Sequence, residues 1–136
     1  MKKRYYVPTF DELIDRLSID HIKKVFSPKK DEALDKEMVN LKKDIDQLLN
    51  DYKVEITSDL ISKIVLLSQI NLHIWELKEK MDNQPDSYDK HLKKAHQLNG
   101  LKNQIKNKLM NHTENSEKKN RTLHTNTDTD SMEAWE

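Results

Sequence analysis

The chain has no cysteine, one glycine and three prolines among its 136 residues. Without cysteine it has no disulfide framework and no thiolate metal site, which agrees with a reducing compartment. The scarcity of glycine and proline removes the residues that build hairpin turns and glycine-rich phosphate loops. Rossmann-type and P-loop nucleotide-binding folds are therefore excluded, and helices joined by short polar links are favoured.

Long apolar runs and a net charge are also missing. No stretch approaches the roughly 20 apolar residues needed to span a bilayer, and residues 1–7 lack the apolar region of a signal peptide. Basic and acidic residues number 24 each, so no chain-wide field attracts nucleic acid or anionic lipid. We expect a soluble, cytoplasmic protein without membrane contact, located in the host cytoplasm if a phage encodes it.

Helical periodicity is what the sequence does contain. Thr9 and Glu12 have the spacing of a capping box, and the apolar pattern that follows predicts a helix over residues 10–26 with two apolar faces. The dipeptide Ser27-Pro28 predicts the start of a second helix. Its apolar residues recur at heptad spacing, which is typical of a helix with one buried face.

Two further helices are predicted. Ser58 is expected to cap the third, which reaches about residue 81 and is apolar on nearly every side. Such a helix belongs in the middle of a fold. The fourth is predicted over residues 87–112.

These elements predict an all-α fold, a small helical bundle of about four helices with a disordered C-terminal tail. Residues 1–8 are expected to form a basic and aromatic arm, residues 9–112 the helical domain, and residues 113–136 a polar, acidic tail. Only 35% of the residues are hydrophobic, so partner helices are expected to supply part of the burial. A homo-oligomer is one such arrangement.

Carboxylate pairs raise the possibility of an enzyme. Glu12 with Asp15, and Glu76 with Glu79, are each three residues apart and project from one helix face. All-α nucleotide pyrophosphatases hold Mg²⁺ with related pairs that converge inside a bundle. The competing interpretation makes Glu12 a capping residue and the other three solvent-exposed, and 24 acidic residues make chance pairs expected. No catalytic, metal or cofactor residue is assigned, and a non-enzyme is favoured.

Polar residues in the apolar third helix invite a second interpretation. Asn71 and His73 need hydrogen bonds if they are buried, and a buried Asn can specify the register between helices. His73 and Glu76 are spaced for one helix face, whereas His91 and His96 are five residues apart and point away from each other. Surface histidines are favoured over a metal site.

Basic residues suggest a nucleic-acid-associated regulator as an alternative. Residues 86–112 contain six lysines and two aspartates, and lysines contact phosphates while tyrosines stack on bases. The neutral chain favours weak binding at most. The candidate residues are Lys2, Lys3, Arg4, Tyr5, Tyr6, Lys90, Lys93 and Lys94.

Met132 and Trp135 stand among acidic residues at the end of the polar tail. An acidic segment with an aromatic anchor suits docking into a basic, partly apolar pocket. That pocket belongs either to a partner protein or to the lysine-rich fourth helix. Both residues are therefore partner-binding candidates.

The segments PTFDELIDRLSI, residues 8–19, and INLHIWELKEKM, residues 70–81, resemble parts of small uncharacterised helical proteins of bacteria and phages. Those proteins share an "ELIDRLSI" opening and an "N-L-x-I-W" helix. The resemblance implies a helical fold and a bacterial or phage setting, and it supplies no mechanism. The favoured function is a non-catalytic adaptor, regulator or inhibitor that binds another protein. The alternatives are the nucleic-acid-associated regulator and an all-α metal-dependent nucleotide hydrolase.

Overall fold

The computed structural model describes residues 8–27 and 29–113. Four α-helices follow one another, with no strand among these residues, and a short 3-10 turn, η1 (Pro85–Ser87), precedes the last. The all-α fold predicted from the sequence is confirmed. The expected N-terminal arm, apart from Pro8, and the expected tail from residue 114 lie outside the described residues. The helices are α1 (Phe10–Phe26), α2 (Glu32–Asp51), α3 (Ser58–Asn83) and α4 (Tyr88–Met110).

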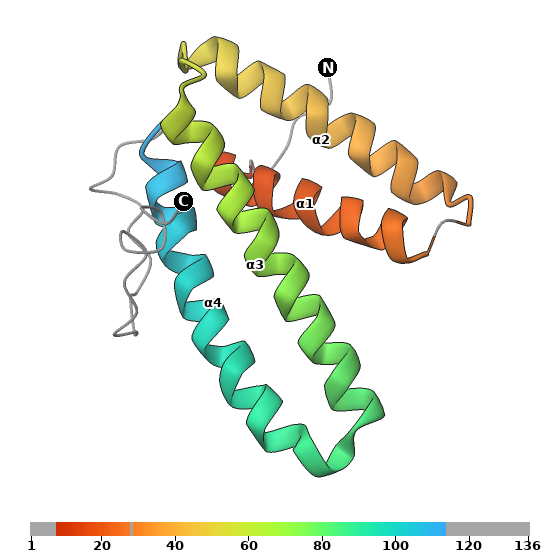
Figure 1. Cartoon of the computed structure of the whole chain (residues 1–136). Helices are drawn as coiled ribbons and strands as arrows, with labels where there is room; N and C mark the ends of the chain where they lie inside the picture. Colours follow the sequence, from red (N-terminus) through yellow and green to blue (C-terminus); the bar gives the residue numbers. More distant parts are fainter. Residues whose placement is uncertain (1–7, 28, 114–136) are drawn as a thin grey trace.

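The helices form two antiparallel pairs, α1 with α2 and the longer α3 with α4 (Figure 1). Helix α1 packs against all three of the others, whereas the backbone of α2 comes close to that of α1 alone among the described helices. The sequence placed the third helix in the middle of the fold. The structure corrects this prediction. Helix α1, not α3, contacts all three other helices, and α3 leaves Ile61 and Val65 about half exposed.

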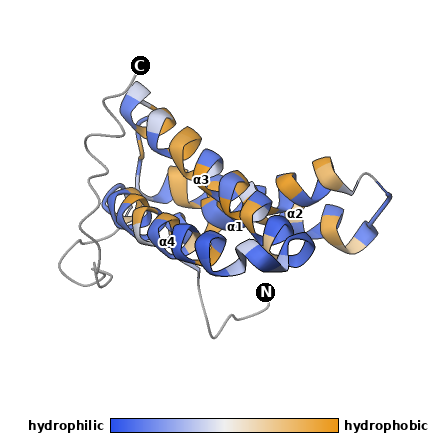
Figure 2. Ribbon diagram, turned by 60° about the horizontal axis from the view of Figure 1, so that its bottom comes forward, coloured by the Kyte–Doolittle hydropathy of each residue, from blue (hydrophilic) through white to orange (hydrophobic). Residues whose placement is uncertain are grey.

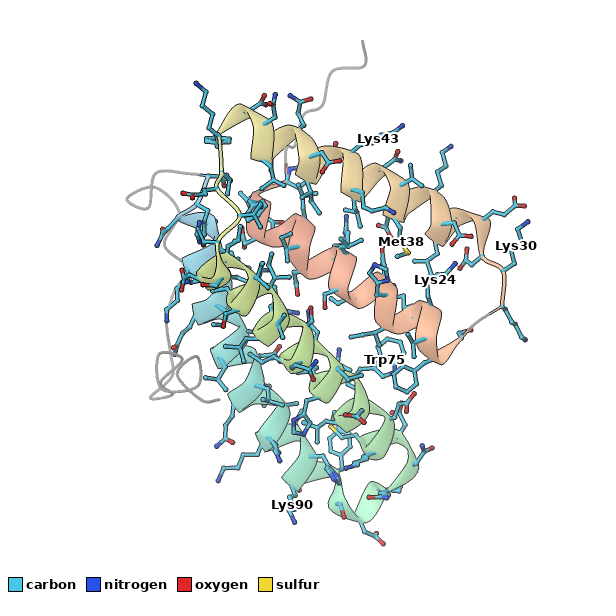
Figure 3. All side chains as sticks on the ribbon, turned by 45° about the horizontal axis from the view of Figure 1, so that its top comes forward. Lys24, Lys30, Met38, Lys43, Trp75 and Lys90 are labelled. Carbon is cyan, nitrogen blue, oxygen red and sulfur yellow. The ribbon has the colours of Figure 1, made fainter. Side chains whose placement is uncertain are left out.

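The core lies where α1, α3 and α4 meet. Each helix has both hydrophobic and hydrophilic residues around its axis (Figure 2), and the hydrophobic residues converge there because their burial removes apolar surface from water. Helix α2 covers one side of α1 with Met38, Leu41 and Ile45, and Met38 points toward α1 in Figure 3. The most completely buried apolar residues are Phe10, Leu60, Leu67, Ile105 and Leu109.

The bounds of α1 match the prediction, but its start differs in chemistry. Thr9 occupies the N-cap position without bonding a backbone N–H. Its hydroxyl instead donates to the carboxylates of Asp11 and, over 2.8 Å, Glu12. The Thr9 half of the predicted capping box is therefore wrong, because the threonine hydroxyl is engaged by two nearby carboxylates.

Helices α2 and α3 begin later or are capped differently than predicted. Helix α2 begins at Glu32, where the Asp31 carboxylate accepts from the Leu34 N–H over 3.0 Å. Helix α3 is capped by Thr57, whose hydroxyl accepts from the Leu60 N–H over 3.2 Å. Asp31 and Thr57 each accept from a backbone N–H of the first turn, which is the bond that an N-cap residue supplies, so these residues and not Ser27 and Ser58 cap the two helices.

Candidate functional site

The N-terminal half of α1 buries charge inside a network. Asp15 is 9% exposed, and its carboxylate accepts from the Asn71 side chain of α3 over 2.8 Å. From α4, the ammonium nitrogens of Lys102 and Lys106 lie 3.2 and 3.4 Å from the two oxygens of the Asp15 carboxylate. Lys106 also lies 4.0 Å from the carboxylate of Asp11, which is fully buried. Asp15 thus joins α1 to α3 and α4, and its charge is compensated.

The contacts of this network test two of the sequence predictions. The expectation that a buried Asn71 would find hydrogen bonds is confirmed, since it also donates to the Ser18 hydroxyl over 3.2 Å. The expectation that Asp15 would be solvent-exposed is wrong, because α4 brings two lysines to it that are distant in sequence. Asp15 is therefore engaged in structural contacts.

The remaining residues of the metal and enzyme hypotheses are scattered. Glu76 and Glu79 are exposed on α3, His96 is exposed on α4, and His73 and His91 are half-buried. In residues 8–27 and 29–113, no group of three or more His, Asp or Glu residues is placed to hold a metal ion. The described part of the chain therefore offers no support for the hydrolase alternative.

In the C-terminal half of α1, apolar side chains are exposed and an acidic side chain is buried. Val25 is 76% exposed and Phe26 45% exposed, whereas Asp20 on the same half-helix is only 1% exposed. The predicted apolar stripes of this helix placed both hydrophobic residues in the interior. They are exposed because α3 passes the end of α1 only along one side, leaving a groove between the two helices.

This α1–α3 groove encloses about 340 Å³. At its end the ring of Phe26 packs against that of Trp75, with centroids 5.9 Å apart and planes inclined by 32°. Figure 3 shows Trp75 projecting from α3 toward the C-terminal end of α1. The groove is lined by Ser18, His21, Ile22, Val25, Phe26, Ser68, Gln69 and Leu72.

The apolar surface continues along α3 beyond the groove. Ile61 and Val65 are 51% and 52% exposed, and together with Ser68 and Leu72 they are spaced to share one face of the helix. The Trp75 indole N–H has no hydrogen-bond acceptor among the described residues although it is buried. Exposed apolar residues that share one face of a helix make this strip a candidate binding surface.

A second concavity, the polar hollow, lies mainly along α1 and encloses about 430 Å³. Asp20 is buried, and its carboxylate oxygen Oδ2 has no hydrogen-bond partner among the described residues. The pKa of Asp20 is raised from 3.8 to about 6, first by burial and then by a side-chain hydrogen bond to Glu37 and the charge of that carboxylate, while Lys23 and Arg16 act in the opposite direction. The hollow is lined by Pro8, Glu12, Leu13, Asp15, Arg16, Ile19, Asp20, Lys23, Glu37 and Lys106.

The predicted macromolecule-binding residues fall in three places. Lys90, Lys93 and Lys94 are exposed near the start of α4, and Figure 3 places Lys90 at the end of the α3–α4 hairpin far from α2. The other nucleic-acid candidates, Lys2, Lys3, Arg4, Tyr5 and Tyr6, lie outside the described residues. So do the partner-binding candidates Met132 and Trp135.

Sequence reasoning missed Asp20 and the groove. A signal was present for Asp20, because an acid that stands between Ile19 and Ile22 interrupts an apolar stripe. No comparable signal marked Val25 and Phe26, whose exposure depends on the crossing of α1 and α3. Among the described helices, none is both long and apolar enough to cross a membrane.

No relative of known structure or function guides the interpretation of the groove and the hollow. Comparisons with family models, with curated proteins and with solved structures gave no match.

Proposed function

We propose that this chain is a non-catalytic helical interaction protein that binds an amphipathic helix of another protein in the α1–α3 groove. One observation carries the proposal. Val25, Phe26 and Val65 are exposed beside a groove between two helices, in a chain whose scarce hydrophobic residues are needed for its core. Covering them would remove apolar surface from water, which favours association.

The floor of the groove suits an apolar occupant. The Ser68 hydroxyl donates to the Ile64 carbonyl over 2.9 Å, and the Ser18 hydroxyl accepts from Asn71 over 3.2 Å. Because both hydroxyls already have partners, apolar side chains can cover them without leaving them unsatisfied. Small side chains in the floor also allow a partner helix to approach closely.

The form of the groove favours a helix over an extended peptide. No described residue belongs to a strand, so the described part of the chain has no sheet edge to which a strand can add. The exposed Ile61 and Val65 of α3, with the half-buried Leu72, present an apolar line parallel to the helix axis. A partner helix with apolar residues at intervals of three and four would match that line.

An adaptor, a regulator and an inhibitor all act by such docking. The resemblance of residues 8–19 and 70–81 to small bacterial and phage proteins favours a partner in a bacterial cell. Capture of the partner, not measurement of an activity, is therefore the appropriate first experiment.

A nucleic-acid-associated regulator is the second candidate. It is favoured by the exposure of Lys90, Lys93 and Lys94 on two successive turns of α4. These lysines are remote from the groove in sequence and stand on a helix that does not line it. The two candidate functions therefore use different residues and can be tested separately by mutation.

The test is affinity capture from bacterial lysate with and without nuclease, followed by measurement of direct binding to each purified partner. Val25→Glu and Val65→Glu place a charge on the apolar surface of the groove side. Val39→Glu is the matched control, because Val39 is 47% exposed on α2, away from the groove. All three variants should keep the helical circular dichroism of the parent chain.

We expect a nuclease-resistant partner whose affinity falls at least tenfold in the two groove variants and is unchanged in the control. Equal binding by all three variants would exclude the groove. Loss of capture after nuclease treatment would support the nucleic-acid candidate instead. Self-association that the groove variants abolish would show that the occupant is a second copy of this chain.

A further inference from the structure

The polar hollow contains a buried carboxylate oxygen, Asp20 Oδ2, that accepts no hydrogen bond from the described residues. We infer that this hollow binds an organic cation, an alkylammonium or a guanidinium group, between the carboxylates of Asp20 and Glu37. The site lies on a different side of α1 from the α1–α3 groove and does not depend on the function proposed for that groove.

Asp20 is the unusual carboxylate in the hollow. It is 1% exposed, and its Oδ2 has no hydrogen-bond partner among the described residues. A buried ionised carboxylate without donors is unfavourable, because it has lost its hydration without gaining a hydrogen bond or a compensating charge. A ligand that donates an N–H bond to this oxygen would therefore bind where the protein is least satisfied.

The other carboxylates of the hollow already have partners. Glu12 accepts from the Thr9 hydroxyl over 2.8 Å, and Asp15 is held by lysines of α4. Glu37 lies 3.7 Å from the Arg16 Nε atom, in a pair whose side chains are 64% and 40% exposed. Such an exposed pair is weak and easily exchanged. An incoming cation can share Glu37 with Arg16 while it satisfies Asp20.

The chain's own cations do not fill the position. Lys106 is committed to Asp15 and Asp11, and Arg16 is mostly in solvent. Lys23 stands one turn after Asp20 on α1 and is exposed, although it is near enough to lower the pKa of Asp20 slightly. Lys23 is therefore the internal competitor that an experiment must control.

The hollow suits an organic cation better than a metal ion. Among the described residues no group of three or more potential ligands converges on one point, whereas an ammonium or guanidinium group needs only two carboxylates. Pro8, Leu13 and Ile19 add apolar walls, which can cover the methylene chain behind the charge. The volume of about 430 Å³ lies in the range of small-ligand pockets.

The test uses the full chain and nuclear magnetic resonance titrations of backbone amides. The probes are n-butylammonium and methylguanidinium as free small molecules, and blocked glycyl-lysyl-glycine and glycyl-arginyl-glycine as peptides. Asp20→Asn removes the charge and keeps the shape. Asp46→Asn changes an exposed carboxylate of α2 in the same way and is the matched control.

We expect saturable shifts confined to residues 16–23 and the neighbourhood of Glu37, with affinity at least tenfold weaker in Asp20→Asn and unchanged in Asp46→Asn. Because Asp20 is mostly protonated below its pKa of about 6, affinity at about pH 5 should be about tenfold weaker than at about pH 7.5. Binding of the free cations indicates a small-molecule ligand, whereas binding of the peptides alone indicates a side chain of a partner protein.

Three results would overturn the inference. The probes can fail to shift any of these amides at millimolar concentration. They can bind Asp20→Asn as tightly as the parent chain. They can also bind only when Lys23→Gln is introduced, which would show that the chain's own lysine occupies the site in solution.

Discussion

The two halves of α1 treat charge and apolar surface in opposite ways. In the N-terminal half, Phe10 is 1% exposed and the buried Asp15 is surrounded by an amide and two ammonium groups. In the C-terminal half, Phe26 is 45% exposed and the buried Asp20 has an oxygen without a partner. The N-terminal half of α1 therefore has a packed interior and a paired buried charge, whereas the C-terminal half has exposed apolar residues and an unpaired buried oxygen.

The difference follows from which helices surround each half. Asp15 contacts residues of both α3 and α4, whereas the groove at the C-terminal end is lined by α1 and α3 alone. Because α4 lines no part of that groove, Val25 and Phe26 stay exposed. Asp20 faces the Glu37 carboxylate of α2, whereas Asp15 faces two lysines. Covering the exposed apolar surface would remove apolar area from water, which is why we propose that a partner binds at this end.

The largest effect is expected from a phenylalanine comparison. Phe10→Ala should lower the free energy of unfolding by about 3 to 5 kcal/mol, because it leaves a cavity in a closed core. Phe26→Ala should lower it by only about 1 kcal/mol, since part of that ring is in solvent and its packing on Trp75 is the main loss. Urea unfolding followed by circular dichroism measures both. Similar losses for the two variants would remove the distinction between the halves.

The next effect compares the two buried aspartates. Asp15→Asn should destabilise the fold by about 2 to 3 kcal/mol, because Lys102 and Lys106 lose a compensating charge. Asp20→Asn should instead stabilise the fold by about 2 kcal/mol at neutral pH, because it removes a buried charge that lacks donors. Equilibrium unfolding gives both values. Destabilisation by Asp20→Asn would mean that its carboxylate has a partner in solution.

The pH dependence of stability sharpens the same contrast. Since the pKa of Asp20 is raised from 3.8 to about 6, the folded state binds a proton between these values that the unfolded state releases. The free energy of unfolding contributed by this group therefore decreases as pH rises from about 4 to about 6 and is constant above. The stability difference between the parent chain and Asp20→Asn isolates this term. A difference that does not change over that range would contradict the raised pKa.

Much of the fold could be predicted from the sequence, because helical periodicity and the lack of turn residues are local properties. The bounds of α1 and the need of Asn71 for a partner followed directly. The burial of Asp15 did not, since Lys102 and Lys106 are brought to it only by the packing of α4. The exposure of Val25 depends likewise on a helix crossing that no local pattern encodes.

The smallest effect concerns nucleic acid. Replacing Lys90, Lys93 and Lys94 by glutamate should weaken a low, salt-sensitive affinity and leave capture by the groove unchanged, because these lysines contact phosphates at most. Filter binding across a salt series, beside the capture assay, measures the two properties. Tight binding that persists at high salt would give the nucleic-acid role precedence over protein binding.

We propose that partners bind the C-terminal end of α1 and the adjoining face of α3. Photoactivatable benzoylphenylalanine placed at Val25, at Val65 and at the control position Val39 tests it most directly. All three side chains are about half exposed or more, so accessibility to the crosslinker is comparable. We expect crosslinks to the captured partner from positions 25 and 65 and none from position 39. Crosslinks from position 39 alone, or equally from all three, would contradict it.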